Sequence, residues 1–250
     1  MTDAPRAEPL AVVDRARSIH YPRATVPNVY SFKDFEGSSH RILIELIRRF
    51  GGRGGTLLDL GAAGGELGAA VRDQFTHTIG FEYNISCLPD LRAHFDQALV
   101  TDLEKVRKLP NGMQAIVIAD VLEHLRDAPA LLALIRKSLT PDGKLFVSVP
   151  NIANVTVRLG LLFGVFEYRE RGILDNTHVR FYTKRTIRRE IENAGFRILS
   201  IRGSSVPIRL IVGGFTPEPL LRFGEYLLTI MTRLWRSLFA YQIIIVAELK

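Results

Sequence analysis

A glycine-rich turn between an apolar segment and a helical pattern constrains the fold of this chain more than any other feature. The stretch is "GTLLDLGAAGGELGAAVRDQF" at residues 55–75. Its glycines let the backbone approach a ligand closely, and the helix that follows offers free N–H groups. The spacing excludes two common nucleotide-binding motifs. The third and sixth positions counted from Gly61 are Ala63 and Glu66, which break the dinucleotide pattern, and no Gly-Lys-Ser/Thr follows as a P-loop requires.

Predicted strands and helices alternate along the rest of the chain. Strands are predicted in "HTIGFEYN", "QALVTDLEKV", "AIVIADVLEHL" and "KLFVSVPN", with helices at 38–52 and 127–139. A helix at 184–195, a strand at 196–203 and a last strand at 241–250 follow. This alternation predicts an α/β fold with a mostly parallel, doubly wound sheet. With 250 residues, of which 47% are hydrophobic and 24% charged, the chain is long enough for one large core.

Acidic residues lie at the ends of the first three predicted strands. Asp59 precedes Gly61 by two positions, Glu82 ends the second strand and Asp102 ends the third. The carboxyl ends of neighbouring strands line one crevice in a doubly wound sheet. There Asp59 can hold an amino group, Glu82 can accept from both ribose hydroxyls, and Asp102 can accept from an adenine amino group.

Five stretches, in order, resemble the motifs of the class I S-adenosylmethionine-dependent methyltransferases: "LLDLGAAGGELG", "IGFEYN", "VTDLEK", "IVIADVLEHL" and "LTPDGKLFVSVPN". The resemblance covers about residues 38–203 and departs at Ala63, where the family usually has glycine. It implies a Rossmann-like sheet with an antiparallel last strand, and S-adenosyl-L-methionine as cofactor. The implied cofactor-binding residues are Asp59, Gly61, Ala62, Glu82, Tyr83, Asp102, Leu103, Ala119 and Asp120.

Two further segments complete the expected domain organisation. We divide the chain into an N-terminal arm (1–37) and a methyltransferase domain (38–250), with an acceptor-side lid at 151–182 and an apolar, basic insertion at 204–240. The stretch 149–183, which contains the lid, has a Pro-Asn start and a "THVRFYT" end, and in these it resembles quinone-biosynthesis O-methyltransferases and methyltransferases of bacterial surface-glycan clusters. Its aromatic side chains either stack on a ring of the acceptor or pack the lid against the sheet.

Glu123 and His124 follow the fourth predicted strand, and His178 comes from the lid. If the chain turns helical after Asp120, positions i, i+3 and i+4 share a face beside the cofactor crevice. Carboxylates and imidazoles together suit a divalent cation such as Mg²⁺. The set resembles small-RNA 3′-end methyltransferases and some quinone O-methyltransferases, which implies Asp120, Glu123, His124 and His178 as metal ligands. The alternative is a hydrogen-bonded cluster without metal, with His124 or His178 as base. Glu123, His124 and His178 are the predicted catalytic residues.

These residues favour transfer to oxygen, because a neutral hydroxyl is a poor nucleophile until a base or a metal takes its proton. We expect an acceptor hydroxyl on a saccharide or a lipid-linked glycan precursor, and hence a role in polysaccharide biosynthesis. The alternatives are a quinone- or polyprenyl-type O-methyltransferase at the membrane surface, an RNA-end methyltransferase, and an inactive cofactor-binding partner protein. We expect no DNA partner.

Charge and cysteine content bear on location. The net charge of +7 favours anionic partners without choosing among them, and the single cysteine, Cys87, fits a reducing compartment. We expect a cytoplasmic protein with peripheral contact at the inner membrane face through residues 205–240. The apolar residues there are interrupted by arginines. Such a segment either lies on a bilayer or packs against the core with its basic side in water.

Overall fold

The computed structural model describes residues 37–206 and 216–250, so most of the predicted N-terminal arm and residues 207–215 of the predicted insertion lie outside the described residues. The strands are β1 (Thr56–Leu60), β2 (His77–Glu82), β3 (Gln97–Val100), β4 (Met113–Ala119), β5 (Leu139–Pro150), β6 (Phe196–Gly203) and β7 (Gln242–Leu249). The α-helices are α1 (Ser39–Phe50), α2 (Glu66–Val71), α3 (Leu88–His94), α4 (Ala128–Ser138), α5 (Val155–Leu162), α6 (Lys184–Asn193), α8 (Glu218–Leu234) and α9 (Arg236–Phe239). Three short 3₁₀ turns are η1 (Arg72–Gln74), η2 (Ile85–Cys87) and η3 (Leu122–His124).

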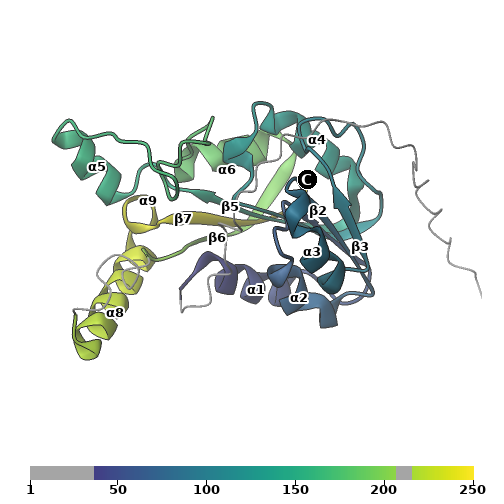
Figure 1. Cartoon of the computed structure of the whole chain (residues 1–250), viewed down its shortest axis with the longest axis horizontal. Helices are drawn as coiled ribbons and strands as arrows, with labels where there is room; N and C mark the ends of the chain where they lie inside the picture. The colour runs from purple at the N-terminus through teal and green to yellow at the C-terminus, as the bar shows by residue number, and fades with distance from the viewer. Residues whose placement is uncertain (1–36, 207–215) are drawn as a thin grey trace, which may run out of the picture.

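The strands form one seven-stranded sheet in the order β3-β2-β1-β4-β5-β7-β6 (Figure 1). Strands β1 to β5 pair in parallel, and β7 runs antiparallel between β5 and β6. Strand order reverses at β1, which is where ligands bind in open α/β sheets. The predicted Rossmann-like, doubly wound sheet with an antiparallel last strand is therefore confirmed.

Helix α1 illustrates how local sequence sets an element. The hydroxyl of Ser38 accepts a hydrogen bond from the Arg41 N–H at the start of the helix, and Gly51 follows its last residue. Leu43 and Ile47, four residues apart on one helix face, are both fully buried. The helix predicted at 38–52 is therefore confirmed, with a side-chain cap, a buried face and a glycine at its end.

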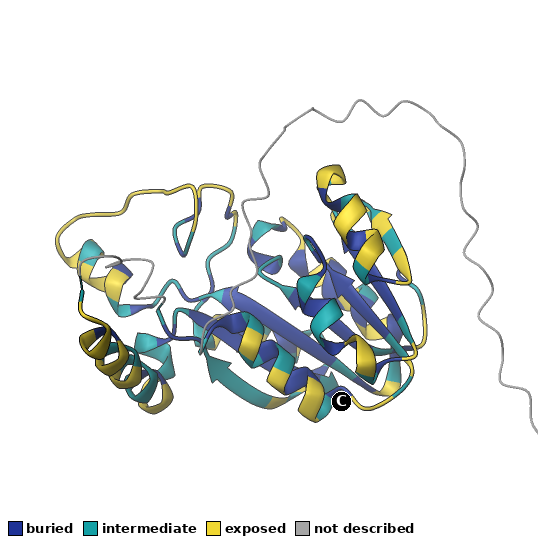
Figure 2. Cartoon of the chain, turned by 60° about the horizontal axis from the view of Figure 1, so that its bottom comes forward, coloured by how far each residue is buried: buried dark blue, intermediate teal, exposed yellow. Residues whose placement is uncertain are grey.

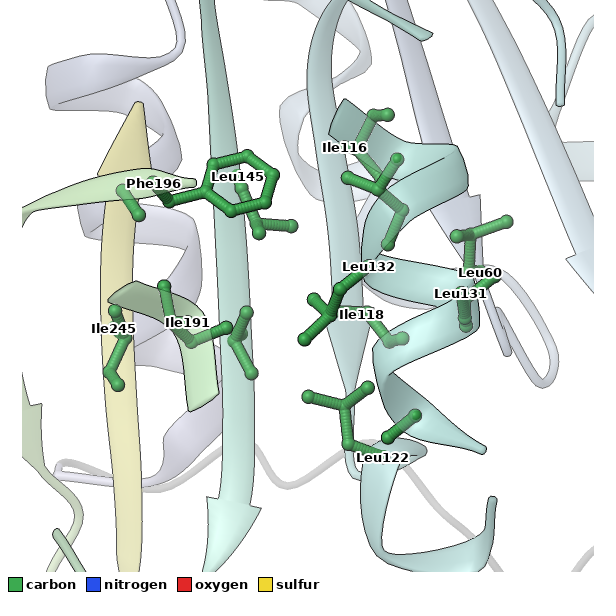
Figure 3. Close-up of a cluster of buried hydrophobic side chains, with 14 of the residues drawn as sticks. Leu60, Ile116, Ile118, Leu122, Leu131, Leu132, Leu145, Ile191, Phe196 and Ile245 are labelled. Carbon is green, nitrogen blue, oxygen red and sulfur yellow. The ribbon is translucent and has the colours of Figure 1, made fainter. Parts of the chain in front are cut away.

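The two faces of the sheet bury different side chains, because successive strand residues point to opposite sides. Leu57 packs with α1 and α2 on one face, and Leu58 packs with α4 and α6 on the other. The central strands are consequently buried on both sides (Figure 2). Figure 3 shows the α4 and α6 side, where Ile116 and Ile118 of β4 meet Leu132 of α4.

Two strand boundaries differ from the prediction. Strand β5 was expected from Lys144 but begins at Leu139, because Leu139 pairs with Met113 before the register shifts and Lys144 pairs with Ala115. Residues 140–143, which were expected to form a turn, lie within β5 at this irregularity. Strand β3 was expected to reach Asp102 but ends at Val100, so Asp102 lies in the connection that follows.

Candidate active site

The glycine-rich turn that begins at Gly61 contacts Phe81 near the end of β2 and Val121 after the end of β4. The N–H groups of Gly61 and Ala62 donate to the Phe81 carbonyl oxygen at 2.8 and 3.0 Å. Gly61 has φ +82°, and a Cβ built there would stand 2.3 Å from Cγ2 of Val121. Since a β-branched side chain has little freedom to move aside, only glycine fits this position.

Ala63 and Asp120 are the non-glycine residues with positive φ in the part of the chain that the structure describes, at +48° and +55°. Both lie at the carboxyl end of the sheet. Glu82 braces Ala63, because its Oε2 accepts the Ala63 N–H at 2.8 Å while its Oε1 accepts the Asn84 N–H at 2.8 Å. Carboxylate oxygens accept more than one hydrogen bond, so Glu82 keeps capacity for the ribose hydroxyls predicted for it.

Asp59 lies in β1 with only 2% of its surface exposed. Burial, and then the nearby Glu82, raise the pKa of the Asp59 carboxyl to about 7. A cationic group that reached this carboxyl would favour its ionised form and lower that pKa again. The environment therefore suits the amino-group contact predicted for Asp59.

The remaining cofactor residues predicted near β2 and β3 lie at the same end of the sheet. The Asp102 carboxylate accepts the Glu104 N–H at 3.0 Å and lies 3.1 Å from Nζ of Lys105. Leu103 packs, partly buried, against the core, whereas Tyr83 is 60% exposed just after β2. Their contacts with the cofactor stay a prediction.

Asp120, the residue after Ala119 at the end of β4, joins three strands. Its Oδ1 accepts from the Ser148 hydroxyl of β5 at 2.8 Å, and its Oδ2 accepts from the side-chain amide of Gln242 in β7. The carboxylate is thus turned toward β5 and β7. It lies outside the cluster of candidate metal ligands formed by Glu123, His124 and His178.

Glu123 and His124 lie in a 3₁₀ turn, η3, where an α-helical face was expected. Leu122 anchors this turn, because its side chain is fully buried at the end of the core cluster beside Ile118 (Figure 3). Asp120 precedes this turn and has a left-handed φ of +55°, so it is not part of one helical face with Glu123 and His124. Asp120 consequently points elsewhere while Glu123 and His124 share one site.

The lid segment is tied to η3 through the backbone. The Glu123 carbonyl oxygen accepts the N–H groups of Val179 and Arg180 at 2.9 and 3.0 Å. The Arg180 guanidinium donates to the carbonyl oxygens of Leu125 and Arg126. These contacts place His178 beside His124, as predicted. They also give Arg180 a structural role.

The three side chains form a compact cluster. One ligand atom from each of Glu123, His124 and His178 lies within 4.8 Å of the others, and the imidazole centroids are 4.8 Å apart at 67°. Glu123 is 1% exposed and His178 9% exposed. Burial, and then the adjacent His124, lower the pKa of His178 below its ordinary value. His178 is therefore neutral near pH 7.

Backbone carbonyls determine which imidazole nitrogens face the cluster. Nδ1 of His178 lies 3.2 Å from the Ile173 carbonyl oxygen, and Nδ1 of His124 lies 3.3 Å from that of Thr177. A carbonyl oxygen only accepts, so each Nδ1 carries the proton and each Nε2 keeps its lone pair. This is the tautomer that metal-binding or basic histidines use.

The donor set fits a small divalent cation after slight closure. Ligand atoms around one ion lie within about 4.2 Å of each other, which is twice a bond of about 2.1 Å. The 4.8 Å span of Glu123, His124 and His178 exceeds this by little. Catalytic contacts commonly tighten when substrates bind.

Aromatic side chains of the lid continue from the histidines. Phe181 lies 6.1 Å from the His178 ring, and its centroid is 6.2 Å from Phe166 and 6.4 Å from Tyr168. Phe166 and Tyr168 are 38% and 58% exposed, whereas Phe163 is 78% exposed. The lid therefore presents a partly open aromatic surface next to Glu123, His124 and His178.

Several residues of the site were not predicted. Thr177 accepts from His124 with its hydroxyl oxygen, 3.1 Å from Nδ1, and donates its own proton to the buried Asp175 at 2.6 Å. Thr177 lay within the quoted "THVRFYT", so a closer reading of that motif could have found it. Ser148 and Gln242 were detectable as polar residues within apolar strand sequences.

A methyltransferase domain family matches residues 35–201, which is more than half of the chain. The chain belongs to this family. It is a class I S-adenosylmethionine-dependent methyltransferase, as its motifs predicted. The matched residues include the glycine-rich turn, η3 and the lid through His178, so the site described above lies within the family's own domain.

Solved structures agree on the fold of this methyltransferase. A SAM-dependent methyltransferase from Archaeoglobus fulgidus superposes with a TM-score of 0.56 at 20% identity, covering 84% of this chain and 95% of that one. Magnesium protoporphyrin IX methyltransferase from Synechocystis, solved with bound SAH, gives a TM-score of 0.59 at 14% identity, covering 86% and 83%. At these identities the likeness concerns the fold alone.

One curated relative is similar in sequence. The ubiquinone biosynthesis O-methyltransferase of Aeromonas salmonicida is 26% identical over 159 residues, which cover 60% of this methyltransferase and 66% of the relative. The match therefore spans slightly less than two thirds of that protein.

Proposed function

We propose that this methyltransferase methylates a phenolic hydroxyl on a quinone-type ring that carries an apolar tail. The observation that carries the proposal is the cluster of Glu123, His124 and His178, which gathers a carboxylate and two imidazole Nε2 atoms at the carboxyl end of β4. These groups are not needed to hold S-adenosylmethionine, so they are available to the acceptor.

The chemistry divides between the donor and the protein. When bound, S-adenosylmethionine supplies a methyl group on a sulfonium that an acceptor oxygen attacks in line. The protein contributes alignment of that oxygen, which lowers the barrier by fixing the two reactants at short range. It also takes the hydroxyl proton. A neutral Nε2 of His178 or His124 is suited to accept it.

A divalent cation fits the same three side chains. A cation such as Mg²⁺, held by Glu123, His124 and His178, would lower the pKa of the acceptor hydroxyl and orient a neighbouring oxygen. The chain's own part is to keep both imidazoles in the required tautomer through the Ile173 and Thr177 carbonyls. An acceptor with adjacent oxygens suits this arrangement.

Two observations support a quinone-type acceptor. The similar protein from Aeromonas salmonicida is named for ubiquinone biosynthesis. The aromatic side chains of Phe166, Tyr168 and Phe181 adjoin His178 and provide flat apolar surface for a ring. The saccharide or lipid-linked glycan acceptor stays a prediction that nothing among the comparisons supports.

Incubation with methyl-labelled S-adenosylmethionine tests the proposal. Purified protein is given separate lipid-extractable, glycan and RNA fractions of a bacterial cell extract. We expect label in an ultraviolet-absorbing, lipid-extractable phenol ether, and loss of this label in Glu123→Gln. Label confined to glycan or to RNA ends would contradict the quinone-type acceptor. Leu99→Ser, which changes an exposed leucine of β3, serves as a control that keeps the label.

A further inference from the structure

Helix α8 carries an apolar stripe that faces away from the sheet. Leu220, Phe223, Leu227 and Leu234 share one helix face by their spacing, and they are 59%, 62%, 46% and 82% exposed. The helix buries only Leu221 and Thr232 of its residues, and these lie on its other face. Of the two alternatives considered for this segment, packing against the core with only the basic side in water does not account for this exposed stripe.

The end of α8 has the composition of a membrane-interface segment. Trp235 follows the helix and is 59% exposed, with Arg233 and Arg236 on either side, and Tyr226 is 66% exposed. From Tyr226 to Phe239 the sequence contains these two arginines and no acidic residue. Tryptophan and tyrosine favour the boundary between water and hydrocarbon, and arginines favour anionic headgroups.

The lid also exposes apolar side chains. Leu161, Leu162 and Phe163 at the end of α5 are 52%, 74% and 78% exposed, and every residue from 161 to 170 is exposed. Both views show α5 and α8 projecting at the same end of the molecule (Figures 1 and 2). Exposed apolar side chains on two projecting elements can be covered together by a planar, deformable layer.

We infer that α8 and the lid dock this methyltransferase onto the surface of a bilayer that contains anionic lipid. Among the described helices, none is long and apolar enough to cross a membrane. An amphipathic helix in the headgroup region uses the side chains found here, namely an apolar stripe flanked by arginines. The inference goes beyond the proposed function, because docking does not depend on the identity of the acceptor.

The chain's only tryptophan makes the test direct, since all tryptophan emission comes from Trp235. The full chain is titrated with phosphatidylcholine vesicles, with and without phosphatidylglycerol, and co-sedimentation is measured in parallel. We expect a blue shift and co-sedimentation with the anionic vesicles, weakened about tenfold in high salt or without phosphatidylglycerol. Absence of binding to anionic vesicles would overturn the inference.

Matched variants locate the surface. Leu227→Ser removes an exposed leucine of α8, and Leu99→Ser removes one of similar exposure, 42% against 46%, on β3 at the far edge of the sheet. We expect Leu227→Ser to weaken vesicle binding several-fold and Leu99→Ser to leave it unchanged, with equal circular dichroism. Equal binding by both variants contradicts the assignment to α8.

Two further outcomes separate the alternatives. A blue shift that grows with protein concentration before vesicles are added, together with dimer formation, would assign the stripe to a second copy of the chain and overturn the membrane inference. Vesicle binding that persists while no phenolic acceptor is methylated would leave the docking intact and reject the proposed function.

Discussion

The two sides of this methyltransferase are built in opposite ways. On the side predicted to bind the cofactor, which we call the cofactor side, side chains such as Asp59 are buried and carried by parallel strands or the turn after them. On the side predicted to receive the acceptor, which we call the acceptor side, Phe163 and Leu162 are largely exposed and are carried by the projecting lid. The cofactor is common to the whole family and needs one fixed geometry, whereas the acceptor differs between members. Rigid strand ends suit the first task and a lid suits the second.

The cluster of Glu123, His124 and His178 lies where these two sides meet. Leu122 fixes one half of the cluster in the core, and the backbone pairing of Glu123 with Val179 and Arg180 fixes the other half. The comparison therefore predicts that substitutions on the cofactor side abolish binding of S-adenosylmethionine. Substitutions in the cluster should leave that binding intact and abolish methyl transfer.

The largest expected effect is on the cofactor side, at Gly61. Gly61→Ala introduces a Cβ at positive φ that would stand 2.3 Å from Val121, so we expect a loss of about 3 kcal/mol in unfolding free energy and no measurable cofactor binding. Gly112→Ala is the control, because Gly112 has φ +79° but no atom within 4 Å of the added Cβ. It should cost only about 1 kcal/mol. Similar losses in chemical denaturation would show that steric contact at the turn is unimportant.

The next effect concerns metal at the acceptor side. Chelator treatment should lower the rate of methyl transfer by about a hundredfold if Mg²⁺ acts as a Lewis acid there, and added Mg²⁺ should restore it. His124→Asn should remove the restoration while binding of S-adenosylmethionine, measured by calorimetry, is unchanged. Transfer that is insensitive to chelator would leave the histidines as bases without metal.

A smaller effect is expected from Asp59, whose pKa is raised from 3.8 to about 7. Because the pKa is raised, the native state binds this proton more tightly than the unfolded chain does. The resulting contribution to the unfolding free energy is complete below pH 3.8 and is lost as pH rises toward about 7. Asp59→Asn carries no charge to bury. Relative to the parent, it should therefore be more stable at pH 8 than at pH 5, by about 2 kcal/mol.

Thermal unfolding at the two pH values measures this difference, and calorimetry measures cofactor affinity in the same variant. We expect Asp59→Asn to bind S-adenosylmethionine more weakly, because the amide has no charge for the amino group. Unchanged affinity would remove Asp59 from the cofactor site, whatever its effect on stability.

The smallest effect is predicted for Ala63, which adopts φ +48° at a position where the family usually has glycine. Ala63→Gly relieves the left-handed strain but increases the freedom of the unfolded chain, so the two terms nearly cancel at about 1 kcal/mol each. We expect a change in melting temperature close to zero and intact cofactor binding. A large loss of affinity would mean that the Ala63 methyl group itself contacts the ligand.

Sequence patterns predicted that Asp59, Glu82 and Asp120 lie at the carboxyl ends of strands, and the structure places them there. The ordered motifs identified the family, whereas binding of the cofactor by these residues stays a prediction. Patterns predicted the acceptor side less well. The 3₁₀ turn at Glu123 depends on the burial of Leu122 and on a tie to Arg180, 57 positions away from Glu123 in the numbering, and no local pattern encodes that contact.

Helix α8 shows a second limit of sequence patterns. Its apolar spacing predicted an amphipathic helix, but the same spacing describes a stripe on the core and a stripe in solvent. Only the packing of Leu221 and Thr232 decides between them. The contacts of Asp120 were likewise not predictable from local spacing, because Ser148 and Gln242 lie in strands whose neighbours are set by the whole sheet.

One measurement tests the central claim that the Glu123, His124 and His178 cluster serves the acceptor rather than the cofactor. In His178→Asn, the dissociation constant of S-adenosylmethionine and the single-turnover rate of methyl transfer are measured on the same preparation, with His77→Gln, at the half-buried start of β2, as control. We predict an unchanged dissociation constant and a transfer rate lowered about a hundredfold or more in His178→Asn, with neither changed in the control. A weakened dissociation constant with a normal transfer rate at saturation would contradict the account.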